Sequence, residues 1–363
     1  MLNCGFLNSS EFTKEASYPF MGADMQWVDS VFNTMTLDEK IGQLFMVAAY
    51  SDPKQDNEAA VKNLITESHI GGVIFFKGSP VRQAQMTNTF QSLAKIPLSV
   101  AIDGEWGLAM RLDSTIAFPR QLQLGAIDKK NEYLIEEMGK EVGRECERIG
   151  IHINFAPVVD INNNPQNPVI NTRSFGEEKE NVARKSLLYM KGLQSHNILT
   201  TAKHFPGHGN TASDSHYTLP LIKGTKDEID KFELYPFKQL IKNDLTGVMI
   251  AHLNVPSMEK TKNLPSTLSR KIVTEKLRDE MNFQGLIFTD ALNMKAVVNA
   301  FPAGEVEVRA LIAGNDVLEF TLDVPKAISA IKQAIVDGRI TEAEVDEHCR
   351  RVLIAKSWMK VPE

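Results

Sequence analysis

The stretch "ILTTAKHFPGHG" at residues 198–209 joins an apolar run to a polar, glycine-rich loop. The run "ILTTAKHF" (198–205) has the composition of a strand that is covered on both faces. Pro206, Gly207 and Gly209 then supply a sharp turn. A buried strand that ends in ionisable side chains is typical of barrels built from parallel strands, whose functional groups lie where the strands end.

Seven similar runs alternate with longer amphipathic stretches, at residues 42–49, 71–76, 97–103, 151–160, 245–253, 285–291 and 315–320. Helical patterns lie between them, such as 131–150, which ends at Gly150 in a C′ position, and 226–243. Eightfold alternation predicts an α/β fold, a single TIM-type (β/α)8 barrel, better than two unrelated domains.

We expect residues 1–24 to form a polar N-terminal tail and residues 25–363 to form the barrel domain. Within that domain, residues 325–358 predict two terminal helices, separated at Gly338 and packed outside the barrel.

The composition, with 43% hydrophobic and 24% charged residues, is that of an ordinary globular protein. A net charge of −6 without a Lys/Arg cluster argues against a nucleic-acid partner. Cys4, Cys146 and Cys349 lie far apart and predict three unpaired thiols in a reducing compartment. Because no apolar run is long enough for a membrane span or signal peptide, we expect a cytoplasmic protein, or a periplasmic one if an export signal has been trimmed.

Six polar residues fall at the predicted strand ends: Asp103, Asp160, Lys203, His204, His252 and Asp290. Any one of them has an ordinary explanation as a surface residue or a buried polar residue. Because the ends of barrel strands meet at one face, however, the six together predict one site there.

The loop after residue 205 raises the question of a metal ion, because His204 and His208 are four residues apart and Asp214 and His216 are two apart. Pro206 and Gly207 prevent the two histidines from sharing one face of a helix. We therefore expect neither a metal site nor a cofactor.

Acid/base chemistry suits this loop better. In an extended segment, Asp214 and His216 place their side chains on the same side. A carboxylate beside an imidazole orients the ring and raises its proton affinity. The pair is a candidate proton donor.

The stretch "AKHFPGHG" followed by "DSH" resembles the signature of glycoside hydrolase family 3, in its bacterial β-N-acetylglucosaminidase (β-N-acetylhexosaminidase) branch. Three other segments resemble the family's motifs, in the same order: "AIDGEWGLAMRL" with Asp103, Glu105 and Arg111, "NTRSFG" with Arg173, and "FTDALNM" with Asp290. The resemblance extends over nearly the whole chain.

This resemblance implies a retaining exo-β-N-acetylglucosaminidase that releases terminal N-acetylglucosamine from peptidoglycan fragments or related β-glycosides, without a cofactor. It implies that Asp290 is the nucleophile and that Asp214 and His216 form an acid/base dyad. The residues that it implies for sugar binding are Asp103, Arg111, Arg173, Lys203 and His204.

The chain departs from the family at residues 104–108, "GEWGL", where many relatives have Gln-Glu-Gly-Gly-Arg. This leaves the pocket shape open. Many relatives also carry further domains, and we expect the acid/base group of this chain to come from within the barrel.

Three other functions stay open. Phosphate competing with water at the glycosyl-enzyme would make the chain an N-acetylglucosaminide phosphorylase. A metal-dependent hydrolase would use His204, His208 and His216, and a non-catalytic sugar-binding barrel would need no nucleophile. We expect His208 to shape the loop instead of reacting. His252 is either a core residue or a residue that supports the site, and the sequence does not decide between the two. Met294 and Trp106 are candidates for side chains that line the pocket.

Overall fold

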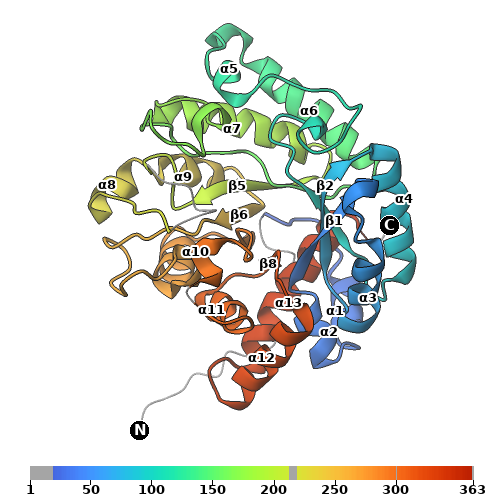
Figure 1. Ribbon diagram of the computed structural model, residues 1–363. Coiled ribbons are helices and arrows are strands. Elements are labelled where there is room, and N and C mark those ends of the chain that lie inside the picture. The colour runs from blue at the N-terminus through green and yellow to red at the C-terminus, as the bar shows by residue number, and fades with distance from the viewer. Residues whose placement is uncertain (1–18, 212–218, 300, 362–363) are drawn as a thin grey trace.

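The computed structural model describes residues 19–211, 219–299 and 301–361. Its eight strands form one parallel sheet in the order β7-β6-β5-β4-β3-β2-β1-β8, and an isolated bridge between Phe288 and Val317 joins the two ends of that order. The sheet is therefore a barrel, and Figure 1 shows helices surrounding it. The predicted (β/α)8 fold is confirmed.

The strands are β1 (Phe45–Ser51), β2 (Gly72–Gly78), β3 (Ser99–Ile102), β4 (Ile153–Asn154), β5 (Leu199–Phe205), β6 (Gly247–Ile250), β7 (Leu286–Thr289) and β8 (Leu318–Glu319). Each overlaps one of the eight predicted runs. The largest difference is β4, which is much shorter than residues 151–160, because Pro157 has no amide to continue the ladder. Inside the barrel, Phe155 and Phe288 pack edge to face at 5.2 Å.

The α-helices are α1 (Met25–Phe32), α2 (Leu37–Gly42), α3 (Glu58–Ser68), α4 (Pro80–Leu93), α5 (Gln121–Gly125), α6 (Tyr133–Arg148), α7 (Lys179–Gln194), α8 (Lys226–Lys231), α9 (Tyr235–Ile241), α10 (Lys295–Val298), α11 (Glu305–Ala313), α12 (Val324–Val336) and α13 (Glu342–Trp358). A π-helix, η7, spans Lys271–Glu280, and short 3-10 turns are η2 (Pro53–Gln55), η3 (Leu108–Met110), η4 (Lys129–Asn131), η5 (Asn171–Arg173) and η6 (Ser266–Leu268). No helix in these ranges is long and apolar enough to cross a membrane.

The helix predictions held with one correction. Residues 226–243 form two helices, α8 and α9, instead of one. Pro236 lies in the first turn of α9, where its missing amide costs no hydrogen bond, so the sequence favours a new start there. Gly150 follows α6 with φ +72° and Gly338 lies between α12 and α13 with φ +69°, as their predicted roles at helix ends require.

Candidate active site

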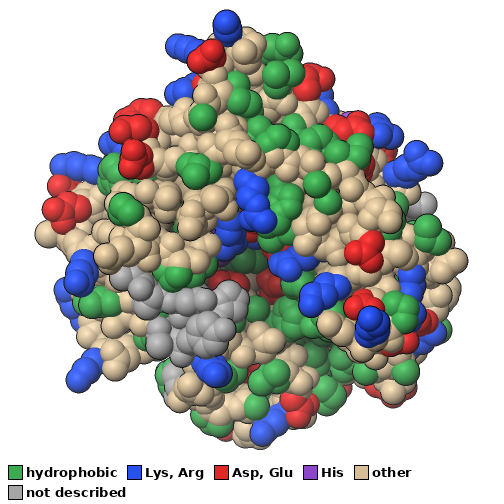
Figure 2. All heavy atoms as spheres, turned by 45° about the horizontal axis from the view of Figure 1, so that its top comes forward, with side chains coloured by type: hydrophobic (Ala, Val, Ile, Leu, Met, Phe, Trp, Pro, Cys, Tyr) green, Lys and Arg blue, Asp and Glu red, His purple; other side chains and the backbone are tan. Residues whose placement is uncertain are grey.

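A cavity of about 430 Å³ opens at the carboxyl ends of the barrel strands. Figure 2 shows a hollow on this face, with Lys and Arg side chains around it and Asp and Glu side chains deeper inside. Its lining comes from the ends of β2, β5, β6 and β8, from the segments after β3 and β7, and from the segment that ends in η5. The residues are Phe76, Asp103, Glu105, Met110, Arg111, Val169, Arg173, Lys203, His204, His208, Met249, Asp290, Ala291, Asn293, Met294, Glu319 and Phe320.

Asp103 follows β3 directly and is held by two cations. Arg111 Nη2 donates to its Oδ2 at 2.6 Å, and Lys203 Nζ donates to its Oδ1 at 2.7 Å. Burial alone would raise the pKa of Asp103, but Lys203 and Arg111 hold it below its usual value. The Arg111 guanidinium also lies over the Phe76 ring, 4.5 Å from its centroid. Asp103 is thus an ionised acceptor at the cavity wall.

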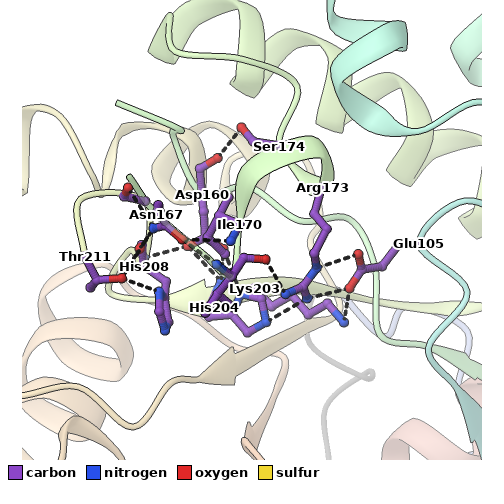
Figure 3. A network of polar contacts seen from close by, with 12 residues as sticks. Glu105, Asp160, Asn167, Ile170, Arg173, Ser174, Lys203, His204, His208 and Thr211 are labelled. Atoms are coloured by element: carbon purple, nitrogen blue, oxygen red, sulfur yellow. Dashed lines mark hydrogen bonds and ion pairs between the residues drawn. The ribbon is translucent and has the colours of Figure 1, made fainter. Parts of the chain in front are cut away.

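Glu105 forms the second half of the same network, which Figure 3 shows from close by. Arg173 donates two hydrogen bonds to the Glu105 carboxylate, from Nε to Oε2 at 2.9 Å and from Nη2 to Oε1 at 2.7 Å. Lys203 Nζ lies 2.9 Å from Oε1. Burial opposes ionisation, but Arg173 and Lys203 hold the pKa of Glu105 well below its usual range. Glu105 was not among the predicted site residues, although its position two residues after Asp103 was a signal.

Asp160, after β4, organises the loop that follows β5. Its carboxylate accepts from the His204 backbone amide at 3.1 Å, from His204 Nδ1 at 2.7 Å and from the His208 amide at 2.7 Å. His204 Nε2 lies 3.3 Å from Arg173 Nη2. Because an arginine only donates, His204 Nε2 accepts in this contact. His204 therefore connects the Asp160 cluster to the Glu105 cluster.

Glycine is required twice in this loop. Gly207 has φ +121°, and a Cβ there would lie 2.8 Å from Glu233 Cβ. A Cβ on Gly209 would lie 1.7 Å from the Ile161 carbonyl oxygen. The His208 ring between them is buried and contacts Thr211 Oγ1 at 2.9 Å, and burial lowers its pKa to about 4. These contacts fix the path of residues 206–211.

Asp290 follows β7 and lines the same cavity. Its Oδ1 accepts from the Ala291 amide at 2.8 Å. Burial alone would raise the pKa of Asp290, but His252, His204 and the amide hydrogen bond hold it below its usual value. His252 is fully buried and contacts Thr267 Oγ1 at 2.6 Å and the Ala291 carbonyl at 3.0 Å, so it supports the backbone beside Asp290.

All five predicted sugar-binding residues and Asp290 thus line one cavity. Met294 lines it as well, whereas Trp106 is absent from the lining and its ring packs against Arg120 at 3.9 Å. Asp214 and His216, the predicted acid/base dyad, lie outside the described residues. Within the described ranges, no group of three or more His, Cys, Asp or Glu side chains is arranged to hold a metal ion.

Comparison with known proteins agrees with the motifs. Residues 36–355 match the model of the glycosyl hydrolase family 3 N-terminal domain. Beta-hexosaminidase A from Pseudoalteromonas piscicida is 33% identical, over 91% of this chain and 62% of the relative. Beta-hexosaminidase LpqI from Mycobacterium tuberculosis is 29% identical, over 88% of this chain and 82% of the relative.

Solved structures extend the likeness to three dimensions. A family 3 beta-N-acetylglucosaminidase from Paenibacillus sp. matches with a TM-score of 0.82 at 34% identity, over 91% of this chain and 64% of that one. The beta-glucoside phosphorylase BglX matches with a TM-score of 0.87 at 26% identity, over 95% of this chain and 62% of that one. The chain spans about three fifths of the length of these two proteins and of the Pseudoalteromonas relative. By its family model and its barrel, the chain belongs to glycosyl hydrolase family 3.

Proposed function

We propose that the chain is a retaining exo-β-N-acetylglucosaminidase with Asp290 as its nucleophile. One observation carries the proposal: Asp290 is an ionised, part-exposed carboxylate at a strand end, facing the cavity that the sugar-binding residues line. Relatives named beta-hexosaminidase and a structure named beta-N-acetylglucosaminidase support the substrate class.

The geometry suits a bound sugar. The Asp103 and Glu105 carboxylates accept hydrogen bonds, while Lys203, Arg173 and Arg111 donate them, so the cavity offers both kinds of partner to hydroxyl groups. Because these groups already bond to one another, little reorganisation is needed when substrate arrives. Asp290 then attacks the anomeric carbon, and the glycosidic bond breaks as a covalent glycosyl-enzyme forms.

The departing oxygen needs a proton, and we assign its delivery to His216 with Asp214 as the supporting carboxylate. The assignment comes from the resemblance of "DSH" to the family motif. After donating its proton, neutral His216 would act as the base that activates water in the second step. Replacing His216 should reduce turnover of alkyl glycosides by about 100-fold or more, and of activated aryl glycosides far less, since only the former need the proton. Equal losses on both substrates would contradict the assignment.

Phosphate is a second candidate acceptor, because the BglX phosphorylase is a close structural match. Such an enzyme would yield N-acetylglucosamine 1-phosphate instead of the free sugar. The geometry of the cavity favours water, since Lys203, Arg173 and Arg111 are each hydrogen-bonded to a carboxylate there. A neutral His216 would nonetheless not repel phosphate as a spent carboxylic acid would.

For the leaving group we propose peptidoglycan fragments, with chitin oligosaccharides as the competing class. For the compartment we propose the cytoplasm, or the periplasm if an export signal has been removed.

The function is tested by mass spectrometry with a fluorinated N-acetylglucosaminide that slows hydrolysis of the glycosyl-enzyme. A covalent adduct should appear on Asp290. A parallel panel of nitrophenyl β-glucoside, β-galactoside and both β-N-acetylhexosaminides, run with and without phosphate, identifies the sugar and the acceptor. An adduct elsewhere overturns the nucleophile, and binding without nitrophenol release would favour a non-catalytic barrel.

A further inference from the structure

Glu319 ends strand β8 and lines the cavity beside Asp290 and Asp103, but nothing in the proposed mechanism uses it. The residue is 3% exposed, and its Oε2 atom is buried without a hydrogen-bond partner in the described ranges. A buried polar atom without a partner costs about 1–3 kcal/mol. In a ligand cavity, a bound ligand that hydrogen-bonds to the Oε2 atom removes this free-energy cost.

The surrounding charges decide which form of the carboxyl is present. Lys203 and Arg111 both bond to Asp103, and Arg173 bonds to Glu105. None of these three cations donates a hydrogen bond to Glu319 in the described part of the chain. Burial, reinforced by the nearby Asp103 and Asp290 carboxylates, raises the pKa of Glu319 well above its usual value, with Lys203 and Arg111 opposing in part. The surroundings of Glu319 thus favour its protonated form, a carboxylic acid whose O–H donates one hydrogen bond.

The order of strands places Glu319 relative to a bound sugar. Asp103 follows β3 and Asp290 follows β7, which lie four strands apart in the ring and hence on opposite sides of the mouth. The arc from β4 to β6 carries Arg173, Lys203 and His204. The other arc carries Glu319 with Phe320 and Phe76, whose rings pack edge to face at 5.2 Å.

A pyranose with its anomeric carbon at Asp290 turns its two edges toward these two arcs. One edge of an N-acetylglucosaminide carries the acetamido group and a hydroxyl, which suit the arc with several donors. The other edge carries the ring oxygen and a hydroxymethyl group, which combines an apolar methylene with a single hydroxyl. The two aromatic rings and the acid O–H match this second edge, beside Arg111, which lies over the Phe76 ring and donates to Asp103.

We propose that Glu319 is a specificity-determining residue that donates its carboxyl proton in a hydrogen bond to the C6 hydroxyl of the sugar held over Asp290. The assignment rests on the proposed function for the orientation of the sugar. It adds a recognition contact that the motifs around Asp103, Arg173 and Lys203 do not contain.

The test compares nitrophenyl β-N-acetylglucosaminide with its 6-deoxy analogue. The wild-type protein should favour the parent sugar by about 10-fold in kcat/KM, the ratio expected when one buried hydrogen bond is lost. Glu319→Met removes the donor at similar length and should reduce this preference to about 2-fold or less. Glu319→Gln keeps an N–H donor and should retain most of the preference. An N-propionyl analogue is the control, because its altered group lies at the opposite edge and its relative rate should be the same in all three proteins.

The outcomes distinguish a failure of the proposed function from a failure of the role assigned to Glu319. If no N-acetylglucosaminide is hydrolysed, the proposed function fails, and calorimetric binding of N-acetylglucosamine and its 6-deoxy analogue to the same three proteins tests Glu319 alone. If the parent sugar is hydrolysed but Glu319→Met slows both substrates equally, Glu319 has no role at C6. If Glu319→Gln abolishes turnover of poor leaving groups and spares activated ones, Glu319 is a proton donor to the leaving group and the proposal is overturned.

Discussion

Two buried carboxylates, Asp316 and Glu105, lie at opposite ends of the barrel strands, and each contacts several cationic side chains. Asp316 precedes β8 and accepts from Arg278 Nη2 at 2.7 Å and His348 Nδ1 at 2.8 Å, with a longer contact to Arg351 at 3.2 Å. Glu105 follows β3 and is held by a two-pronged arginine and a lysine. In both, burial opposes ionisation, but the adjacent cations hold the pKa well below its usual range.

The difference lies in where the cations come from. Those around Asp316 belong to η7 and α13, so the cluster joins outer helices to the strand at the closed end of the barrel. Those around Glu105 line the cavity and face its interior. The same ionic chemistry therefore holds the fold at one end of the strands and is presented to a ligand at the other.

Asp290→Ala should separate function from stability most sharply. We expect kcat/KM to fall by about 10⁴-fold or more, because the covalent step loses its proposed nucleophile. The free energy of unfolding should change by no more than about 1 kcal/mol, because the substitution removes a part-exposed carboxylate that accepts one amide hydrogen bond and makes no ion pair in the described residues. Steady-state kinetics and urea denaturation measure the two quantities. If the variant is less stable but its folded fraction retains full specific activity, Asp290 stabilises the fold, as Asp316 does, and is not the nucleophile.

Asp316→Asn should give the opposite profile. Removing this fully buried carboxylate leaves the part-buried Arg278 without its anionic partner, so we expect a loss of about 3–5 kcal/mol in unfolding free energy. The kcat of the folded fraction should be unchanged, since Asp316 does not line the cavity. Asp227→Asn is the control, because its ion pair with Lys231 is exposed to solvent and should change the unfolding free energy far less than Asp316→Asn does.

The pH dependence of Asp316→Asn gives an independent check. The folded pKa of Asp316 lies below its unfolded value, so its contribution is present above the unfolded pKa and is lost as pH falls through the folded one. The wild-type protein should therefore lose stability on acidification more steeply than the variant. Parallel denaturation curves between pH 3 and pH 6 for the two proteins would contradict a structural role for the charge.

Sequence patterns sufficed for the barrel and for most of the site, because strand direction alone brings the ends of eight strands together. Asp103, Lys203, His204 and Asp290 each follow or end an apolar run, and all four line the cavity. Glu105 was named in the motif after Asp103 but was given no role, because the sequence does not show which cations its carboxylate contacts. Its pairing with Arg173 joins residues 68 positions apart.

Glu319 was missed for a different reason. In "NDVLEF" a single acid among apolar residues fits the end of a strand, and whether it faces the barrel interior or the surrounding helices depends on register. An ionisable residue within a buried strand was still a usable signal, because such residues are seldom buried without a purpose. The break between α8 and α9 was likewise indicated by Pro236.

The final prediction concerns Glu233, a buried carboxyl that lies beneath Gly207 in the loop after β5. Asn163 Nδ2 donates to its Oε1 at 3.3 Å, and its Oε2 has no partner in the described ranges. Burial, reinforced by the charge of Asp160, raises the pKa of Glu233 to about 7. This shift is the reverse of those of Asp316 and Glu105, because no cation among the described residues pairs with Glu233.

Because its folded pKa exceeds the unfolded value, Glu233 favours the folded state fully below the unfolded pKa, and this contribution is lost as pH rises through about 7. At about 1.4 kcal/mol per pKa unit, ionisation at pH 8 destabilises the protein by roughly 3 kcal/mol relative to pH 4. Glu233→Gln keeps the acceptor for Asn163 and cannot ionise, so it should raise the unfolding free energy by up to about 3 kcal/mol at pH 8 and by little at pH 5. Urea denaturation at both pH values measures this difference. If the substitution changes the unfolding free energy equally at the two pH values, Glu233 does not titrate between them. Burial without a neighbouring cation would then not raise the pKa of Glu233 above those of the ion-paired carboxylates Asp316 and Glu105.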